Sequence, residues 1–128
     1  MLEAALCVAL AKNLVIDKIN FLSHEFGAYP EIVEYVVMNE SKKDWRDRLL
    51  PCGDGDQHID DPDGNPHRSR GIVQINEYWH PEVSDAAAYD PDFAILFLIK
   101  GLRDGKCHEW TTCRKFKKEN PDHPYFGK

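Results

Sequence analysis

The chain has 128 residues, of which 42% are hydrophobic and 30% are charged. This length and balance suit one globular domain over residues 1–128 and exclude a disordered chain. The formal net charge of −6 gives the average surface the sign that repels phosphate groups, so we expect no nucleic acid partner.

The N-terminal segment carries apolar residues at helical spacing over residues 2–26, and Gly27 is a suitable stop. The first sixteen residues are apolar, but no Lys or Arg precedes the run and Glu3 interrupts it, which argues against a signal peptide. The run is also too short and too polar to span a bilayer. We therefore expect an amphipathic helix and no membrane insertion.

A second helix is predicted to begin at Pro30, because proline fits the first turn. Apolar side chains at helical spacing give it a buried stripe, and Glu40 and Ser41 lie at its C-terminal end. Residues 51–70 are rich in Gly, Pro, Asp and Asn and predict turns with a short exposed β-hairpin, whose tip is DDPDGN.

The second half predicts more helix. Asp90 and Pro91 form an N-cap and first turn, and the nearly continuous apolar run Phe93–Leu102 predicts a central buried helix that ends at Gly105. Residues 114–128 are expected to form a loosely packed tail, rich in proline from Pro121 onward. The expected fold class is α+β, mainly α, with one small hairpin.

Four cysteines are present. Cys107 and Cys113 bracket a short segment and can close a local disulfide loop, whereas Cys7 lies among apolar residues as expected of a buried thiol. The sequence leaves the partner of Cys52 open. A local disulfide fits an exported protein, although four reduced thiols fit equally well.

Glu40 is the first candidate for chemistry. A carboxyl half-buried against the apolar helix that it ends would have a raised pKa, as a general acid near neutral pH requires. The alternative is an ordinary solvated Glu at a helix end.

Further motifs follow Glu40 in order. Asn39-Glu40-Ser41 is followed by the stretch from Ser69 to Asn76 (SRGIVQIN), then by Trp79-His80-Pro81 and by the segment YDPDFAI that starts at Tyr89. This ordered set, from about Ile16 to Cys113, resembles the lysozyme-like superfamily, above all soluble lytic transglycosylases and goose-type lysozymes.

The resemblance implies a helical domain in which the hairpin flanks a glycan-binding groove. It also implies that Glu40 protonates the β-1,4 glycosidic oxygen between N-acetylmuramic acid and N-acetylglucosamine in peptidoglycan, without a cofactor. Planar amides and hydroxyls suit sugar recognition, and a structural amide is the alternative for Gln74. The residues expected to contact the substrate are Ser41, Ser69, Gln74, Asn76 and Tyr78.

The second carboxylate decides the reaction. Hen-type lysozymes carry their Asp at the position of Ser69, so that nucleophile is absent from its expected place. Asp54 resembles the Asp that goose-type lysozymes carry in the hairpin, and Asp56 and Asp63 compete with it. The reading slightly favoured is a lytic transglycosylase; an inverting lysozyme that uses Asp54 to position water is the alternative.

Other classes of function fit the sequence less well. The acidic loop from Asp54 to Asn65 lacks the ligand order of an EF-hand, and the histidines and cysteines lack the spacing of zinc ligands. The rival is a peptidoglycan-binding module without turnover, since a Tyr-Asn-x-Gly element common in lytic transglycosylases is missing. The protein is expected to act at the cell wall, as a secreted protein, as a periplasmic protein or after delivery by a phage.

Overall fold

The computed structural model describes residues 2–40, 56–60 and 66–127, and the side chains of residues 13–40 and 69–127 within them. The described elements, in chain order, are α1 (Leu2–Phe26), α2 (Pro30–Glu40), β1 (Asp56–Asp60), β2 (Pro66–Arg70), β3 (Ile75–Asn76), α4 (Asp85–Tyr89), α5 (Pro91–Arg103), the 3-10 helix η1 (Cys107–Glu109), α6 (Thr111–Glu119) and α7 (Pro124–Gly127). The expected α+β class, mainly α, is confirmed at this level.

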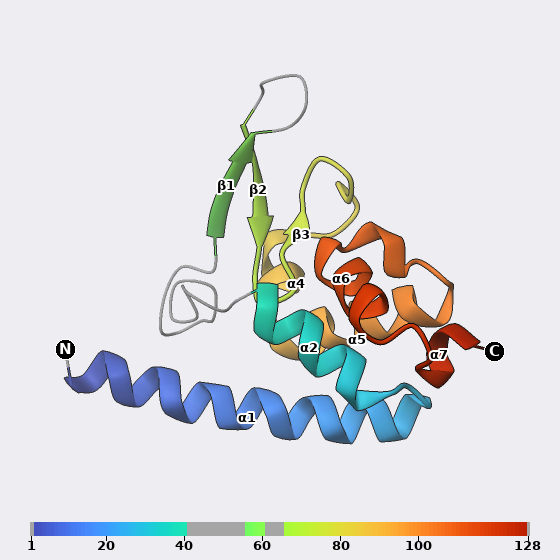
Figure 1. Cartoon of the computed structure of the whole chain (residues 1–128). Coiled ribbons are helices and arrows are strands. Elements are labelled where there is room, and N and C mark those ends of the chain that lie inside the picture. The colour runs from blue at the N-terminus through green and yellow to red at the C-terminus, as the bar shows by residue number, and fades with distance from the viewer. Residues whose placement is uncertain (1, 41–55, 61–65, 128) are drawn as a thin grey trace.

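Helix α1 lies along one side of the molecule, and α2 folds back across its C-terminal part (Figure 1). The reversal follows from Gly27, whose φ of +70° is readily adopted only by glycine, and from a 2.8 Å hydrogen bond that Ala28 N donates to the Ser23 carbonyl. Helix α2 begins at Pro30 and ends at Glu40, as predicted.

The core lies between α1, α2 and α5. Val15 and Ile19 of α1 are buried with one face of α2, and α5 contributes most of its apolar residues. Asp90 caps α5, because its carboxylate accepts a hydrogen bond from Asp92 N at 3.0 Å. The predicted central helix and its N-cap are therefore confirmed.

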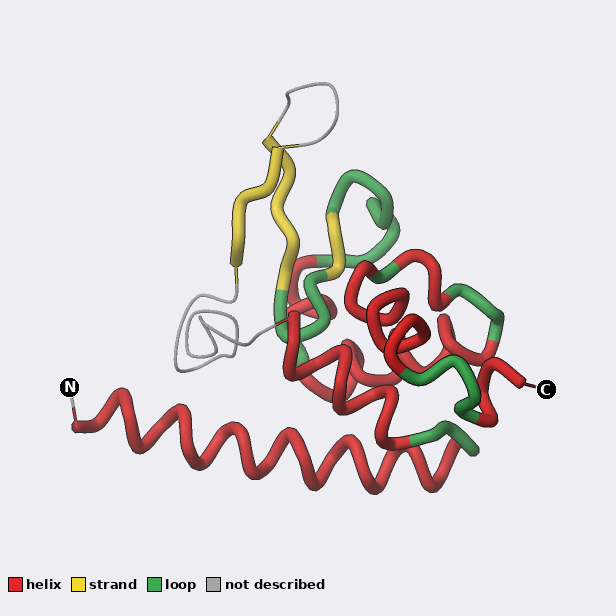
Figure 2. Tube along the Cα trace, in the orientation of Figure 1, coloured by secondary structure: helices red, strands yellow, loops and turns green. Residues whose placement is uncertain are grey.

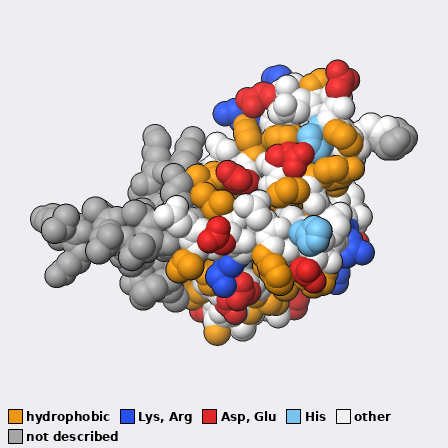
Figure 3. Space-filling view, turned by 90° about the horizontal axis from the view of Figure 1, so that it is seen from below, with side chains coloured by type: hydrophobic (Ala, Val, Ile, Leu, Met, Phe, Trp, Pro, Cys, Tyr) orange, Lys and Arg blue, Asp and Glu red, His pale blue; other side chains and the backbone are white. Residues whose placement is uncertain are grey.

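The outer side of α1 carries apolar side chains that stay exposed, among them Leu14 and Phe21 with 60% and 63% of their surface accessible. In Figure 3, which views the molecule from this side, apolar side chains are interspersed with charged ones. Among the described helices, none combines the length and hydrophobicity needed to cross a bilayer.

The strands form one antiparallel sheet in the order β1-β2-β3 at one end of the helical body (Figure 2). Asp56 pairs with Arg70 and Asp60 with Pro66, which confirms a hairpin in this region. Strand β3 pairs with the end of β2 and brings Asn76 opposite Ser69. The hairpin tip, residues 61–65, lies outside the described residues.

Arg70 connects the sheet to the helices. Its side chain is only 2% exposed, and its guanidinium donates to the carbonyls of Ile75 (3.1 Å), Val83 (2.9 Å) and His80 (3.4 Å) and to the Asp85 carboxylate (2.9 Å). A buried charge is tolerated only when its donors are satisfied in this way. One side chain thus fixes the chain from β3 to α4.

Gly71 follows Arg70 and allows the close approach of α4. Its φ is +74°, and a Cβ at this position would lie 2.2 Å from the carbonyl oxygen of Ala88. Only glycine therefore fits between β2 and α4 without moving the backbone.

The expectation of a loosely packed tail over residues 114–128 is corrected for its described part. Phe116 of α6 is buried, and Tyr125 and Phe126 of α7 pack against the core. The Tyr125 hydroxyl donates to the Leu102 carbonyl, and His123 lies edge-on against Phe116 with ring centroids 5.4 Å apart. The aromatic residues outweigh the turn-rich composition that suggested a tail.

Replacing Arg70 by Gln is expected to lower the free energy of unfolding by about 3 kcal/mol or more, because several buried acceptors lose their donor. Urea denaturation measures the change. The exposed Arg103→Gln is the matched control and should stay within about 0.5 kcal/mol of wild type. Equal effects of the two substitutions would contradict the role given to Arg70.

Tyr125→Phe is expected to lower the free energy of unfolding by about 1 kcal/mol, through loss of the bond to Leu102. Burial raises the pKa of Tyr125 above its ordinary value of 10.0, so the folded state resists ionisation of this phenol. The free energy of unfolding of wild type should therefore fall as pH rises through about 10. The difference in this free energy between wild type and Tyr125→Phe should become smaller over the same range. Denaturation at pH 8 and at higher pH tests this, with Tyr29→Phe as the control; a constant difference would contradict it.

Candidate functional site

A cleft of about 650 Å³ opens between the sheet and the C-terminal helices. Its walls come from the end of α2, the chain from β2 to residue 80, α5, and the segment from η1 to α6. The lining residues are Glu40, Ser69, Gln74, Ile75, Asn76, Trp79, His80, Phe97, His108, Glu109, Trp110, Thr111 and Arg114. The cleft thus brings together Glu40, Ser69, Gln74 and Asn76, which the sequence predicted as site residues.

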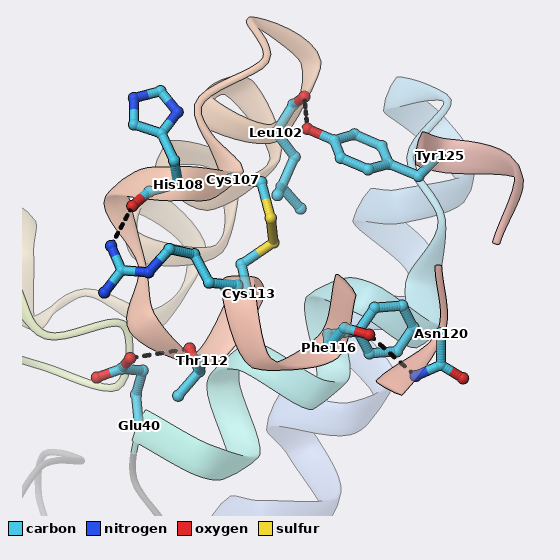
Figure 4. The surroundings of a disulfide bond; sticks show 10 residues. Glu40, Leu102, Cys107, His108, Thr112, Cys113, Phe116, Asn120 and Tyr125 are labelled. Atoms are coloured by element: carbon cyan, nitrogen blue, oxygen red, sulfur yellow. Dashed lines mark hydrogen bonds between the residues drawn. A yellow bond between two sulfur atoms is a disulfide. The ribbon is translucent and has the colours of Figure 1, made fainter. Parts of the chain in front are cut away.

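Glu40 lies at the last residue of α2, where the helix points its end at the cleft. Its side chain is half-buried, and the Thr112 hydroxyl of α6 donates to its carboxylate at 2.9 Å (Figure 4). This hydrogen bond fixes the carboxyl group in one orientation. The half-buried position is as expected, while the raised pKa stays a prediction.

Gln74 ends the tight turn that follows Gly71. It has a φ of 59°, its backbone N–H donates to the Gly71 carbonyl at 3.1 Å, and its side-chain Nε2 donates to the same oxygen at 2.7 Å. The structural amide considered as the alternative for Gln74 is thus observed for its Nε2. Its Oε1 is buried and has no hydrogen-bond partner among the described residues.

Asn76 has a more structural role than the sequence suggested. Its Oδ1 accepts hydrogen bonds from Tyr78 N at 2.8 Å and Trp79 N at 3.4 Å, and its Nδ2 donates to Ser69 Oγ at 3.3 Å. The amide oxygen is therefore occupied in shaping the turn after β3. Ser69 is 3% exposed and lines the cleft beneath this amide.

Tyr78 does not line the cleft, although it was predicted to contact the substrate. It packs edge-on against Trp79, with ring centroids 4.7 Å apart. Trp79 does line the cleft and is 63% exposed, so the aromatic surface comes from the neighbouring residue. The turn that Asn76 holds decides which of the two rings faces the cleft.

The opposite wall is held by the disulfide between Cys107 and Cys113, which joins η1 to α6 and is the local bridge that the sequence allowed (Figure 4). Between them, Trp110 is 8% exposed and lines the cleft. Its ring sits against Gly101 of α5, where a Cβ would lie 2.7 Å from the indole Cη2. The small residue on α5 therefore leaves room for the indole.

Glu109 is a second carboxylate of the cleft that the sequence did not suggest. It lies on η1, and its Oε1 is 3.9 Å from His80 Nε2. The other ring nitrogen of His80 lies 3.2 Å from Glu82, whose carboxyl pKa is lowered by a backbone hydrogen bond and then by His80. No motif marks Glu109 in the sequence; its place depends on how η1 packs.

The other predicted site residues cannot be placed. Ser41, Asp54 and Asp63 lie outside the described residues, and only the backbone of Asp56 is described, at the start of β1. Cys52 and the side chain of Cys7 also lie outside them. Within the part of the chain that the structure describes, no cluster of three or more His, Cys, Asp and Glu residues is arranged to hold a metal ion.

Comparison of the chain with protein-family models, with curated proteins and with solved structures finds no match.

Gly101→Ala is expected to push the Trp110 indole out of place and to lower the free energy of unfolding by about 1–3 kcal/mol, through overpacking. Lys100→Ala, at an exposed position of the same helix, is the control. Denaturation measures stability, and near-ultraviolet circular dichroism reports the tryptophan environment. An unchanged spectrum together with unchanged stability would show that α5 does not constrain the indole.

Proposed function

We propose that this protein is a lysozyme-like domain that cleaves the glycan strands of bacterial peptidoglycan between N-acetylmuramic acid and N-acetylglucosamine. The observation that carries the proposal is the position of Glu40. Its half-buried carboxylate faces a cleft of about 650 Å³ and is held there by the Thr112 hydroxyl. A positioned carboxyl group in a partly desolvated cleft is what proton transfer to a glycosidic oxygen requires.

The walls of the cleft suit a chain of sugars. Trp79, which is largely exposed, and Trp110 line the cleft and offer aromatic surface, against which the apolar C–H face of a pyranose ring can pack. Gln74 lines the cleft and contributes an amide side chain to its wall. Amides and aromatic rings therefore surround the place where Glu40 acts.

In the proposed mechanism, Glu40 first donates its proton to the glycosidic oxygen, and the bond from that oxygen to C1 of the muramoyl residue breaks. The Glu40 carboxylate then removes the proton from the C6 hydroxyl of the same residue, whose oxygen bonds to C1. The product is a 1,6-anhydromuramoyl end. This route needs no carboxylate as nucleophile, and it therefore agrees with Ser69 at the position where hen-type lysozymes carry their Asp.

Two alternatives remain as outcomes of the test. If Asp54 positions a water, the product is a reducing end formed with inversion. If the cleft binds glycan without turnover, the protein is a peptidoglycan-binding module.

The deciding experiment is mass spectrometry of sacculi digested by the purified protein. Wild type is expected to release anhydro products, which are lighter than reducing-end products by one water. Glu40→Gln is expected to slow release by about 10²–10⁴-fold, the usual contribution of a general acid. Glu34→Gln, on the same helix and away from the cleft, is the matched control and should keep the wild-type rate.

The outcomes separate the proposals. Wild-type rates from Glu40→Gln would overturn the assignment of Glu40. Reducing-end products would select the lysozyme alternative. Wild type that releases nothing but sediments with insoluble peptidoglycan would support the binding module.

A further inference from the structure

A second cavity, of about 550 Å³, adjoins the cleft and shares His108 and Arg114 with it. It lies behind the disulfide-linked segment, on the side of α7. The residues that line it are Leu102, Arg103, Gly105, Cys107, His108, Arg114, Lys117, Tyr125 and Phe126. None of these is acidic.

The cavity concentrates positive charge in a protein with a net charge of −6. Arg103, Arg114 and Lys117 carry full charges, and none of them is within ion-pair distance of a carboxylate among the described residues. Like charges that gather without counter-charges repel one another, so the cavity favours an anion.

Two of the three cationic side chains contact neighbouring residues of the cavity wall. Arg114 donates to the His108 carbonyl at 2.7 Å and to the Thr111 hydroxyl at 3.1 Å, which orients its guanidinium at the boundary of the two cavities. Lys117 Nζ lies 5.7 Å from the ring centroid of Phe126. The Tyr125 ring is held by its bond to Leu102. A site with two partly held cations and aromatic walls suits an amphipathic anion.

We propose that this cavity is a subsite for the carboxylates of the peptide branch that muramoyl residues carry. The inference rests on the proposed function. Because the two cavities meet at His108 and Arg114, a substituent of a sugar bound in the cleft can extend into the second cavity. The peptide on the lactyl group of muramic acid is such a branch, and it bears free carboxylates. Guanidinium groups bind carboxylates in bidentate geometry.

The test is a binding measurement by calorimetry in the Glu40→Gln background, which keeps the substrate intact. The probes are a muramoyl-containing tetrasaccharide with its peptides, the same tetrasaccharide without peptides, and a glycerol phosphate oligomer. The cavity variant is Arg103→Gln with Lys117→Gln. The matched control, Lys115→Gln with Lys118→Gln, removes the same charge from α6 outside the cavity.

The peptide is expected to tighten binding by about tenfold or more, as one to two charge-assisted hydrogen bonds would. The cavity variant should lose this gain, and the control should keep it. Equal binding of both tetrasaccharides would overturn the subsite alone. Absence of binding by either tetrasaccharide would overturn the proposed function as well. A cavity that takes only the phosphate oligomer would overturn the peptide as its ligand.

Discussion

The buried guanidinium of Arg70 is the interaction on which one wall of the cleft depends. It gathers acceptors from β3, from the turn after it and from α4, all in segments too short to satisfy their own backbone groups. The turn at Gln74 and the amide of Asn76 take their positions from this arrangement. The wall is therefore built on one charged side chain and its partners, and only in part on apolar packing. Such a wall is stiff, because each donor has a fixed direction.

The opposite wall is held by different means. The Cys107–Cys113 disulfide joins η1 to α6, Gly101 admits the Trp110 indole against α5, and α6 packs on α2. Glu40 lies where the two walls meet, since it ends α2 and accepts from Thr112 of α6. A displacement of α6 would therefore move both the aromatic wall and the carboxylate. A disulfide, a close steric contact and a hydrogen bond therefore all act on this wall of the cleft.

Much of the scaffold could be predicted from the sequence, because local signals agreed with tertiary packing. Pro30, Asp90 and Gly27 mark helix boundaries by backbone chemistry that does not depend on the rest of the fold. The site was predicted unevenly. Glu40 and Gln74 were predicted from a motif, and both line the cleft. Tyr78 was also predicted to contact the substrate, but Trp79 lines the cleft instead, because the turn after β3 decides which of the two adjacent rings faces it. Glu109 and the buried state of Arg70 depend on long-range packing, which no local pattern reports. The error over the tail has the same origin, since Phe126 packs against Phe116 of another helix and the Tyr125 hydroxyl bonds to the Leu102 carbonyl.

Gln74 joins the scaffold to the proposed chemistry. A left-handed backbone is unfavourable for a residue with a side chain, and a buried acceptor without a partner adds roughly 1–3 kcal/mol to that penalty. The bond from Nε2 to Gly71 offsets part of it, but the same bond turns Oε1 away from the backbone and leaves it unsatisfied. Because Nε2 must face the carbonyl, the two ends of the amide cannot be exchanged. The fold thus maintains a strained backbone and an unfavourable buried acceptor in a residue that lines the cleft. Backbone strain of this kind gathers at binding and catalytic sites, which supports the cleft as the functional site of the protein.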